Sequence, residues 1–125
     1  MESNGDFWLY DLKVETVIGD RTAVCHHIEG ESFEVQGENL VFTAGQRLSM
    51  YALAAILPLL PAKQRDTADN DWMTTDAEVA CPDPNCGARF LITRTEKRWF
   101  THGGTTGLPE GRGTPYWQDE EKNER

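Results

Sequence analysis

The most constraining stretch of this sequence is a turn that carries two cysteines between two strand-like runs. The turn covers residues 81–87, Cys-Pro-Asp-Pro-Asn-Cys-Gly, and the runs cover residues 77–80 and 88–94. The prolines fix the backbone, the Asp and Asn side chains can bond to it locally, and glycine tolerates a positive φ. Two strand-like runs joined by so short a connection predict a β-hairpin with a rigid turn.

The first forty residues favour short antiparallel strands. Between Tyr10 and Thr16, apolar and charged side chains alternate with a period of two, which is typical of a half-buried strand. Residues 32–35 alternate again, and residues 40–42 follow a Gly-containing turn. Residues 22–25 fit either a short strand or a loop.

The pattern then changes to that of a helix. Ser49 is a suitable N-cap for an alanine-rich run from about Ser49 to Leu60, which Pro58 and Pro61 should kink or end. The run is apolar nearly all round, so we expect burial on more than one side. The polar segment that follows is expected to form a surface loop that folds back, with the Trp72 side chain packed against the core as an apolar plug. The predicted fold is α+β: a small, mostly antiparallel sheet packed on one principal buried helix, with an extended C-terminal tail.

A chain of 125 residues fits one domain, which we place at residues 1–100. Residues 101–125 are rich in Gly, Thr, Pro and charge, and we expect an extended or disordered tail. Tyr116 and Trp117 lie within it. An aromatic pair in such a segment indicates a docking anchor for a protein partner or for a second copy of the chain.

The formal net charge of −9 lies mostly ahead of residue 96. An acidic domain without a Lys/Arg cluster should repel nucleic acid and anionic membranes, so we expect neither as a partner. The N-terminus lacks the features of a secretory signal, which predicts a cytoplasmic protein. Its three cysteines are then expected to be reduced thiols or metal ligands.

The candidate chemistry lies in Cys25, the adjacent histidines, Cys81 and Cys86. Thiolate and imidazole are preferred ligands of zinc and iron, and four such groups complete a tetrahedral site. The predicted ligand set is Cys25, His27, Cys81 and Cys86, although the sequence leaves open whether His26 or His27 faces inward. Free cysteines are also common as small core residues, so no cofactor is required by the sequence. A thiol–disulfide pair and a cysteine nucleophile with His27 as a candidate catalytic base are further alternatives.

The order of these motifs resembles a family of small, largely uncharacterised bacterial and archaeal α+β proteins. The matching pieces are, in order, Lys13-Val14-x-x-Val17, Cys25-x-His27 with Gly30-Glu31-x-Phe33, Leu48-Ser49-x-Tyr51-Ala52 with Leu57-Pro58, and Cys81-Pro82-Asp83-Pro84. The resemblance covers about residues 10–95 and implies that Cys25, His27 and Cys81 belong to the family pattern. It also implies a cysteine at the start of the helix, where this chain has Ser49.

Three classes of function follow from these observations. The first expectation is a small accessory or interaction subunit of a larger assembly, for example one that supports a metabolic enzyme. It would use exposed aromatics and the Tyr116-Trp117 pair to dock. The second is a zinc- or iron-binding domain. The third is a small enzyme with a pocket near the helix N-terminus, and the sequence does not decide whether the chain is an enzyme.

Overall fold

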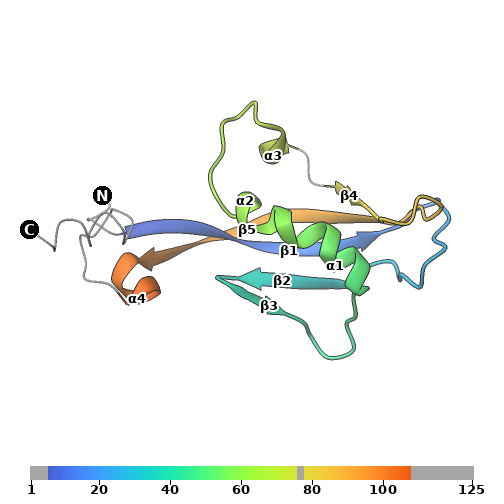
Figure 1. The fold of residues 1–125 in the computed structure, drawn as a ribbon, viewed down its shortest axis with the longest axis horizontal. Helices are drawn as coiled ribbons and strands as arrows, with labels where there is room; N and C mark the ends of the chain where they lie inside the picture. The colour runs from blue at the N-terminus through green and yellow to red at the C-terminus, as the bar shows by residue number, and fades with distance from the viewer. Residues whose placement is uncertain (1–5, 76–77, 108–125) are drawn as a thin grey trace, which may run out of the picture. The chain divides into compact units, whose positions relative to one another are not determined.

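The computed structural model describes residues 6–75 and 78–107, and its central feature is a five-stranded antiparallel sheet (Figure 1). The strands are β1 (Asp6–Val17), β2 (Ser32–Gln36), β3 (Asn39–Val41), β4 (Glu78–Ala80) and β5 (Arg89–Thr101). Their order across the sheet is β3-β2-β1-β5-β4. The predicted hairpin is present as β4–β5, and β2 and β3 pair as a second hairpin. The sheet together with the helices described below confirms the α+β class.

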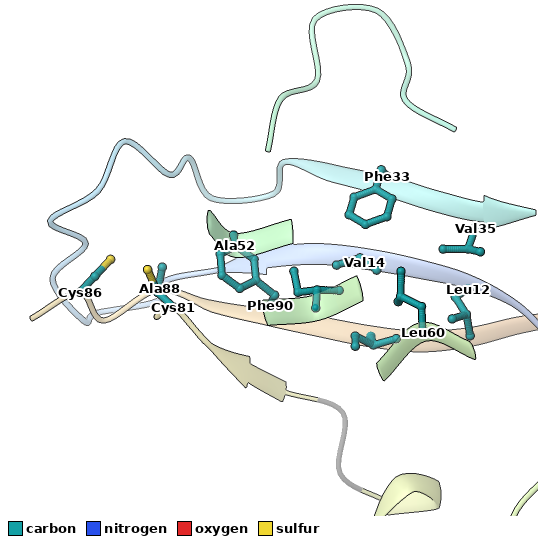
Figure 2. Packing of buried hydrophobic residues seen from close by; sticks show 12 residues of the cluster. Leu12, Val14, Phe33, Val35, Ala52, Leu60, Cys81, Cys86, Ala88 and Phe90 are labelled. Atoms are coloured by element: carbon teal, nitrogen blue, oxygen red, sulfur yellow. The ribbon is translucent and has the colours of Figure 1, made fainter. Parts of the chain in front are cut away.

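Strand pairing brings the apolar residues of the alternating strands onto one face. Leu12 lies opposite Val35 and Val14 lies opposite Phe33, and all four side chains are buried. Side chains at every second position of a strand share a face, so this register places the apolar set of β1 beside that of β2. Phe90 of β5, which is fully buried, extends the same face (Figure 2).

One helical segment covers this face. It consists of α1 (Met50–Ile56), a 3₁₀ turn (Leu57–Leu59) and α2 (Leu60–Lys63). The Ser49 side chain caps α1, because its Oγ accepts hydrogen bonds from the amides of Tyr51 and Ala52 at 3.1 and 3.4 Å. The α-helix gives way to the 3₁₀ turn at Pro58, which lacks a backbone donor, in agreement with the predicted kink or end there. Pro61 does not end the segment, because it lies in the first turn of α2, where a proline is tolerated.

The helical segment buries one stripe only. Ala52, Ile56 and Leu60 follow one another at helical spacing and are at most 3% exposed, whereas Met50 and Tyr51 are 70% and 68% exposed. The expectation of burial on more than one side is therefore wrong. The stripe of buried residues packs on the apolar face of the sheet, whereas Leu57, like Met50 and Tyr51, stays exposed on the other side of the helical segment.

Two further expectations need correction. Trp72 opens the short helix α3 (Trp72–Thr75) and is 57% exposed, so it is no plug, and Met73 is buried in its place. Residues 102–106, expected within an extended tail, form the short helix α4 (His102–Thr106), which the Thr101 side chain caps. Residues 22–25, left open between strand and loop, form a loop.

The chain divides into two compact units. The larger, Leu9–Arg98, contains α1 to α3 and most of the sheet, and it holds all the candidate ligands. Of the smaller unit, the structure describes residues 6–8 and 99–107, in which the rings of Phe7 and Phe100 stack at 5.3 Å. Within the described residues, no helix has the length and apolar character needed to cross a membrane.

Candidate metal centre

The four predicted ligands come from two segments far apart in the sequence. Cys25 and His27 lie in the loop of residues 18–31, which connects β1 to β2, whereas Cys81 and Cys86 lie in the turn between β4 and β5. Figure 2 shows Cys81 and Cys86 at one end of the buried core cluster. The two segments meet because β1 and β5 are neighbours in the sheet and the loop and the turn adjoin the same end of these strands.

Hydrogen bonds hold the loop against the turn. The amide of Gly87 donates to the carbonyl oxygen of Thr22 at 2.7 Å, and Nε of Arg21 donates to the carbonyl oxygen of Gly87 at 2.7 Å. The approach is so close that a Cβ built on Gly87 would lie 2.8 Å from Cβ of Arg21 and 2.8 Å from the oxygen of Thr22. Glycine at this position is therefore a requirement of the close backbone contact.

The loop is also fixed internally by an acidic side chain. Oε1 of Glu29 accepts hydrogen bonds from the amides of Ile18 and Gly19, each at 2.9 Å. These backbone hydrogen bonds, from Gly19 and then Ile18, lower the pKa of the Glu29 carboxyl below its usual value. Gly30 takes a φ of 84°, which lets the chain turn back into β2.

The cysteine turn has the internal bonding that the sequence predicted. Oδ1 of Asp83 accepts a hydrogen bond from the amide of Asn85 at 2.9 Å, and the amide of Cys86 donates to the carbonyl oxygen of Asp83 at 3.0 Å. The amide of Cys81 donates to the carbonyl oxygen of Ala88 at 3.1 Å, which extends the hairpin by one pair. The turn therefore presents both thiols on a stiff frame.

The four ligand atoms of Cys25, His27, Cys81 and Cys86 all lie within 4.8 Å of one another. Sγ of Cys25 lies 3.9 Å from Sγ of Cys81, and Nε2 of His27 lies 3.4 Å from Sγ of Cys81. Tetrahedral zinc, with bonds of about 2.3 Å to sulfur and about 2.05 Å to nitrogen, requires separations of about 3.8 Å and about 3.5 Å. These two pairs already stand at such distances, and the widest pair would have to close by about 1 Å.

The pKa values of Cys86 and Cys25 are shifted in opposite directions. For Cys86, burial favours a higher pKa, but the backbone amides of Cys25, Ala88 and Val24, together with the Cys81 side chain, lower the pKa of the thiol to about 7. Burial, followed by hydrogen bonds and charge from Cys81 and Cys86, raises the pKa of the Cys25 thiol to about 12. Backbone amides directed at a buried sulfur favour the thiolate, which is the form that binds metal.

The structure decides between the two adjacent histidines. Nε2 of His27 points at Cys81, and the His27 ring also packs edge-on against Phe90 at a centroid distance of 5.1 Å. His26 is exposed and lies outside the ligand cluster. The contact between His27 and Cys81 is also the one that a cysteine nucleophile with a histidine base would need. A metal centre uses all four converging groups, whereas that pair uses two.

The sequence did not indicate the supporting role of three other residues near the cluster. Glu29, Arg21 and Gly87 hold the loop and the turn together, and no local pattern marks the first two because their partners are backbone groups of the folded chain. The sequence suggested that Gly87 allows a positive φ in the turn, but its φ is not positive. Its small size is required by the contact with Thr22.

Comparisons with protein-family models, with curated proteins and with solved structures found no match to this chain. The family resemblance drawn from the sequence motifs therefore stays a prediction. The predicted docking pair, Tyr116 and Trp117, lies outside the described residues, and the role as an accessory subunit stays a prediction too.

Proposed function

We propose that this chain is a metal-binding protein that holds one zinc or ferrous ion through Cys25, His27, Cys81 and Cys86. The observation that carries the proposal is the convergence of all four ligand atoms within 4.8 Å. Thiolate-rich sets with one imidazole are typical of tetrahedral structural zinc sites and are also suited to ferrous iron.

The surroundings of the cluster support this function. Cys81 and Cys86 are 7% and 5% exposed, so two of the four ligands are shielded from water. Backbone amides directed at Cys86 favour its thiolate at neutral pH. A thiolate buried with hydrogen-bond donors but without a full counter-charge is stabilised further by a divalent cation.

The ion would act as a cross-link. It would join the loop of residues 18–31 to the β4–β5 turn, two segments that two hydrogen bonds at Gly87 also connect. Because metal binds the folded arrangement of ligands far better than the unfolded chain, its binding free energy adds to the stability of the fold. We expect the metal-loaded protein to resist unfolding more than the metal-free protein.

Elemental analysis of protein purified without an affinity tag of histidines tests the proposal. We expect about one equivalent of zinc or iron per chain, and cobalt(II) substitution should give the visible absorption of a tetrahedral sulfur-ligated site. His27→Ala should lose most of the metal, whereas the neighbouring His26→Ala should retain it. A folded protein that takes up no metal even when zinc is supplied would refute the proposal.

A further inference from the structure

Two cavities open beside the proposed metal centre, and they meet at Cys25, Ser49 and Tyr51. The larger has a volume of about 640 Å³ and is bordered on one side by Cys25 and Cys81. The outer face of α1 and the tip of the cysteine turn form the rest of its lining. A concave site of this size, next to converging metal ligands, is where a small molecule would be expected to bind.

The walls of the larger cavity are mostly apolar. Ala54 and Ala55 line it from α1, and Pro82 lines it from the turn. The small alanine side chains leave open the space that larger residues on this face of the helix would fill. Tyr51, 68% exposed, adds an aromatic ring at the edge. These walls favour a ligand with an apolar body.

The charge of the cavity has one sign. Asp83 contributes a carboxylate, and the described residues that line the cavity include no lysine, arginine or histidine. Oδ2 of this carboxylate lies 3.6 Å from Sγ of Cys25, while Oδ1 accepts the hydrogen bond from Asn85. The centre formed by a divalent ion, three thiolates and a neutral imidazole would carry a net negative charge.

Arg47, which lines the adjoining smaller cavity, does not reverse this charge. Arg47 lines the smaller cavity, of about 430 Å³, together with Glu31. Nε of Arg47 lies 3.5 Å from Oε2 of Glu31, so the two charges offset each other. A carboxylate or phosphate ligand in the larger cavity would therefore meet Asp83 and the thiolates without a basic partner.

We propose that the larger cavity binds a small organic cation with an apolar body, placed with its charge between the Asp83 carboxylate and the Tyr51 ring. An aromatic face attracts a cation through its quadrupole, and a carboxylate supplies the counter-charge. The apolar part of the ligand lies along Ala54, Ala55 and Pro82. This inference rests on the proposed metal centre only for the added negative charge of the thiolates, since Asp83 and Tyr51 are present without the metal.

Three probes of similar size and different charge test the proposal: benzyltrimethylammonium, benzyl alcohol and phenylacetate. The quaternary ammonium ion keeps its charge at every pH and has no lone pair with which to ligate a metal. Isothermal titration calorimetry should show that the cation binds about tenfold tighter than the neutral alcohol, and that the anion binds weakest. Equal affinity for the three probes would overturn the proposal.

Variants separate the two contacts. Asp83→Asn keeps the size of the side chain and should weaken binding of the cation by about fivefold to tenfold without changing that of benzyl alcohol. Tyr51→Leu, at an exposed position, should weaken binding of the cation by about threefold to fivefold. Asp69→Asn removes an exposed carboxylate outside the cavity and should change neither. Unchanged cation affinity in both Asp83→Asn and Tyr51→Leu would overturn the proposal.

Measuring each protein before and after removal of metal keeps this inference apart from the proposed function. Cation selectivity in a protein that never binds metal would refute the metal centre and support the cavity. A metal-loaded protein without cation selectivity would support the metal centre and refute the cavity.

Discussion

The close contact at Gly87 gives the sharpest test of how the metal centre is built. In Gly87→Ala, the new methyl group would lie 2.8 Å from Cβ of Arg21 and 2.8 Å from the carbonyl oxygen of Thr22. Since the second of these is a backbone atom, the clash cannot be relieved by rotating a side chain. The loop and the turn must move apart, which separates Cys25 from Cys86.

The magnitude follows from the contacts that are lost. Two hydrogen bonds join Gly87 to Arg21 and Thr22, and each contributes about 1 kcal/mol. Overpacking by one methyl group typically costs a further 1–3 kcal/mol or so. We therefore expect the free energy of unfolding of the metal-free protein to fall by about 3–5 kcal/mol. Zinc affinity should fall by at least about tenfold, because a ligand shift that costs about 1.4 kcal/mol already has that effect.

Urea unfolding of metal-free protein and competition for zinc with a chromophoric chelator measure the two quantities. Gly45→Ala is the control, because Gly45 has a φ of 84° and a Cβ there would meet nothing within 4 Å. That variant should lose about 1 kcal/mol to backbone strain and keep its zinc affinity. A Gly87→Ala protein with the stability and zinc affinity of the parent would refute the reasoning.

Two further predictions concern charged side chains away from the ligands. In the folded protein the pKa of Glu29 is lowered from about 4.5, so its contribution to stability is complete above that pH and is lost as the pH falls through the lower folded value. In metal-free Glu29→Gln, the free energy of unfolding should therefore fall less steeply as the pH is lowered. An unchanged pH dependence at acid pH would contradict this role of Glu29. Arg98 donates to both carboxylate oxygens of Asp11, at 3.1 and 2.7 Å, and Asp11 is 7% exposed. Arg98→Ala would leave that carboxylate buried without its guanidinium, and we expect a loss of roughly 2 kcal/mol in urea unfolding. A loss below about 0.5 kcal/mol would show that the pair behaves as an exposed one.

Local features of the sequence predicted the elements of the fold well. The alternation around Leu12 and Val14 specifies a strand with one buried face, because successive side chains of a strand point to opposite sides. Ser49 ahead of an alanine-rich run specifies where a helix begins. The short proline-containing turn between two apolar runs specifies a hairpin. Each of these signals depends on neighbours in the chain, so it is present before the chain folds.

The ligand set was also predicted from residue types, but its geometry was not. Soft ligands are few in this chain, so Cys25, Cys81 and Cys86 were the evident candidates. Adjacent side chains of a loop can point in any direction, so the sequence could not decide between His26 and His27. Only the pairing of the strands brings the ligands together, and it places Nε2 of His27 3.4 Å from Cys81.

The tertiary structure alone decided what surrounds these elements. The apolar run of α1 was expected to be buried widely, yet the sheet covers one stripe of it and leaves Tyr51 beside an open cavity. The roles of Glu29 and Arg21 arise from hydrogen bonds to backbone groups that approach only in the folded chain. The sequence by itself determined the strands, the helix start and the stiff cysteine turn. Packing decided that the turn meets the loop at Gly87, because no spacing along the chain encodes a contact between segments more than sixty residues apart.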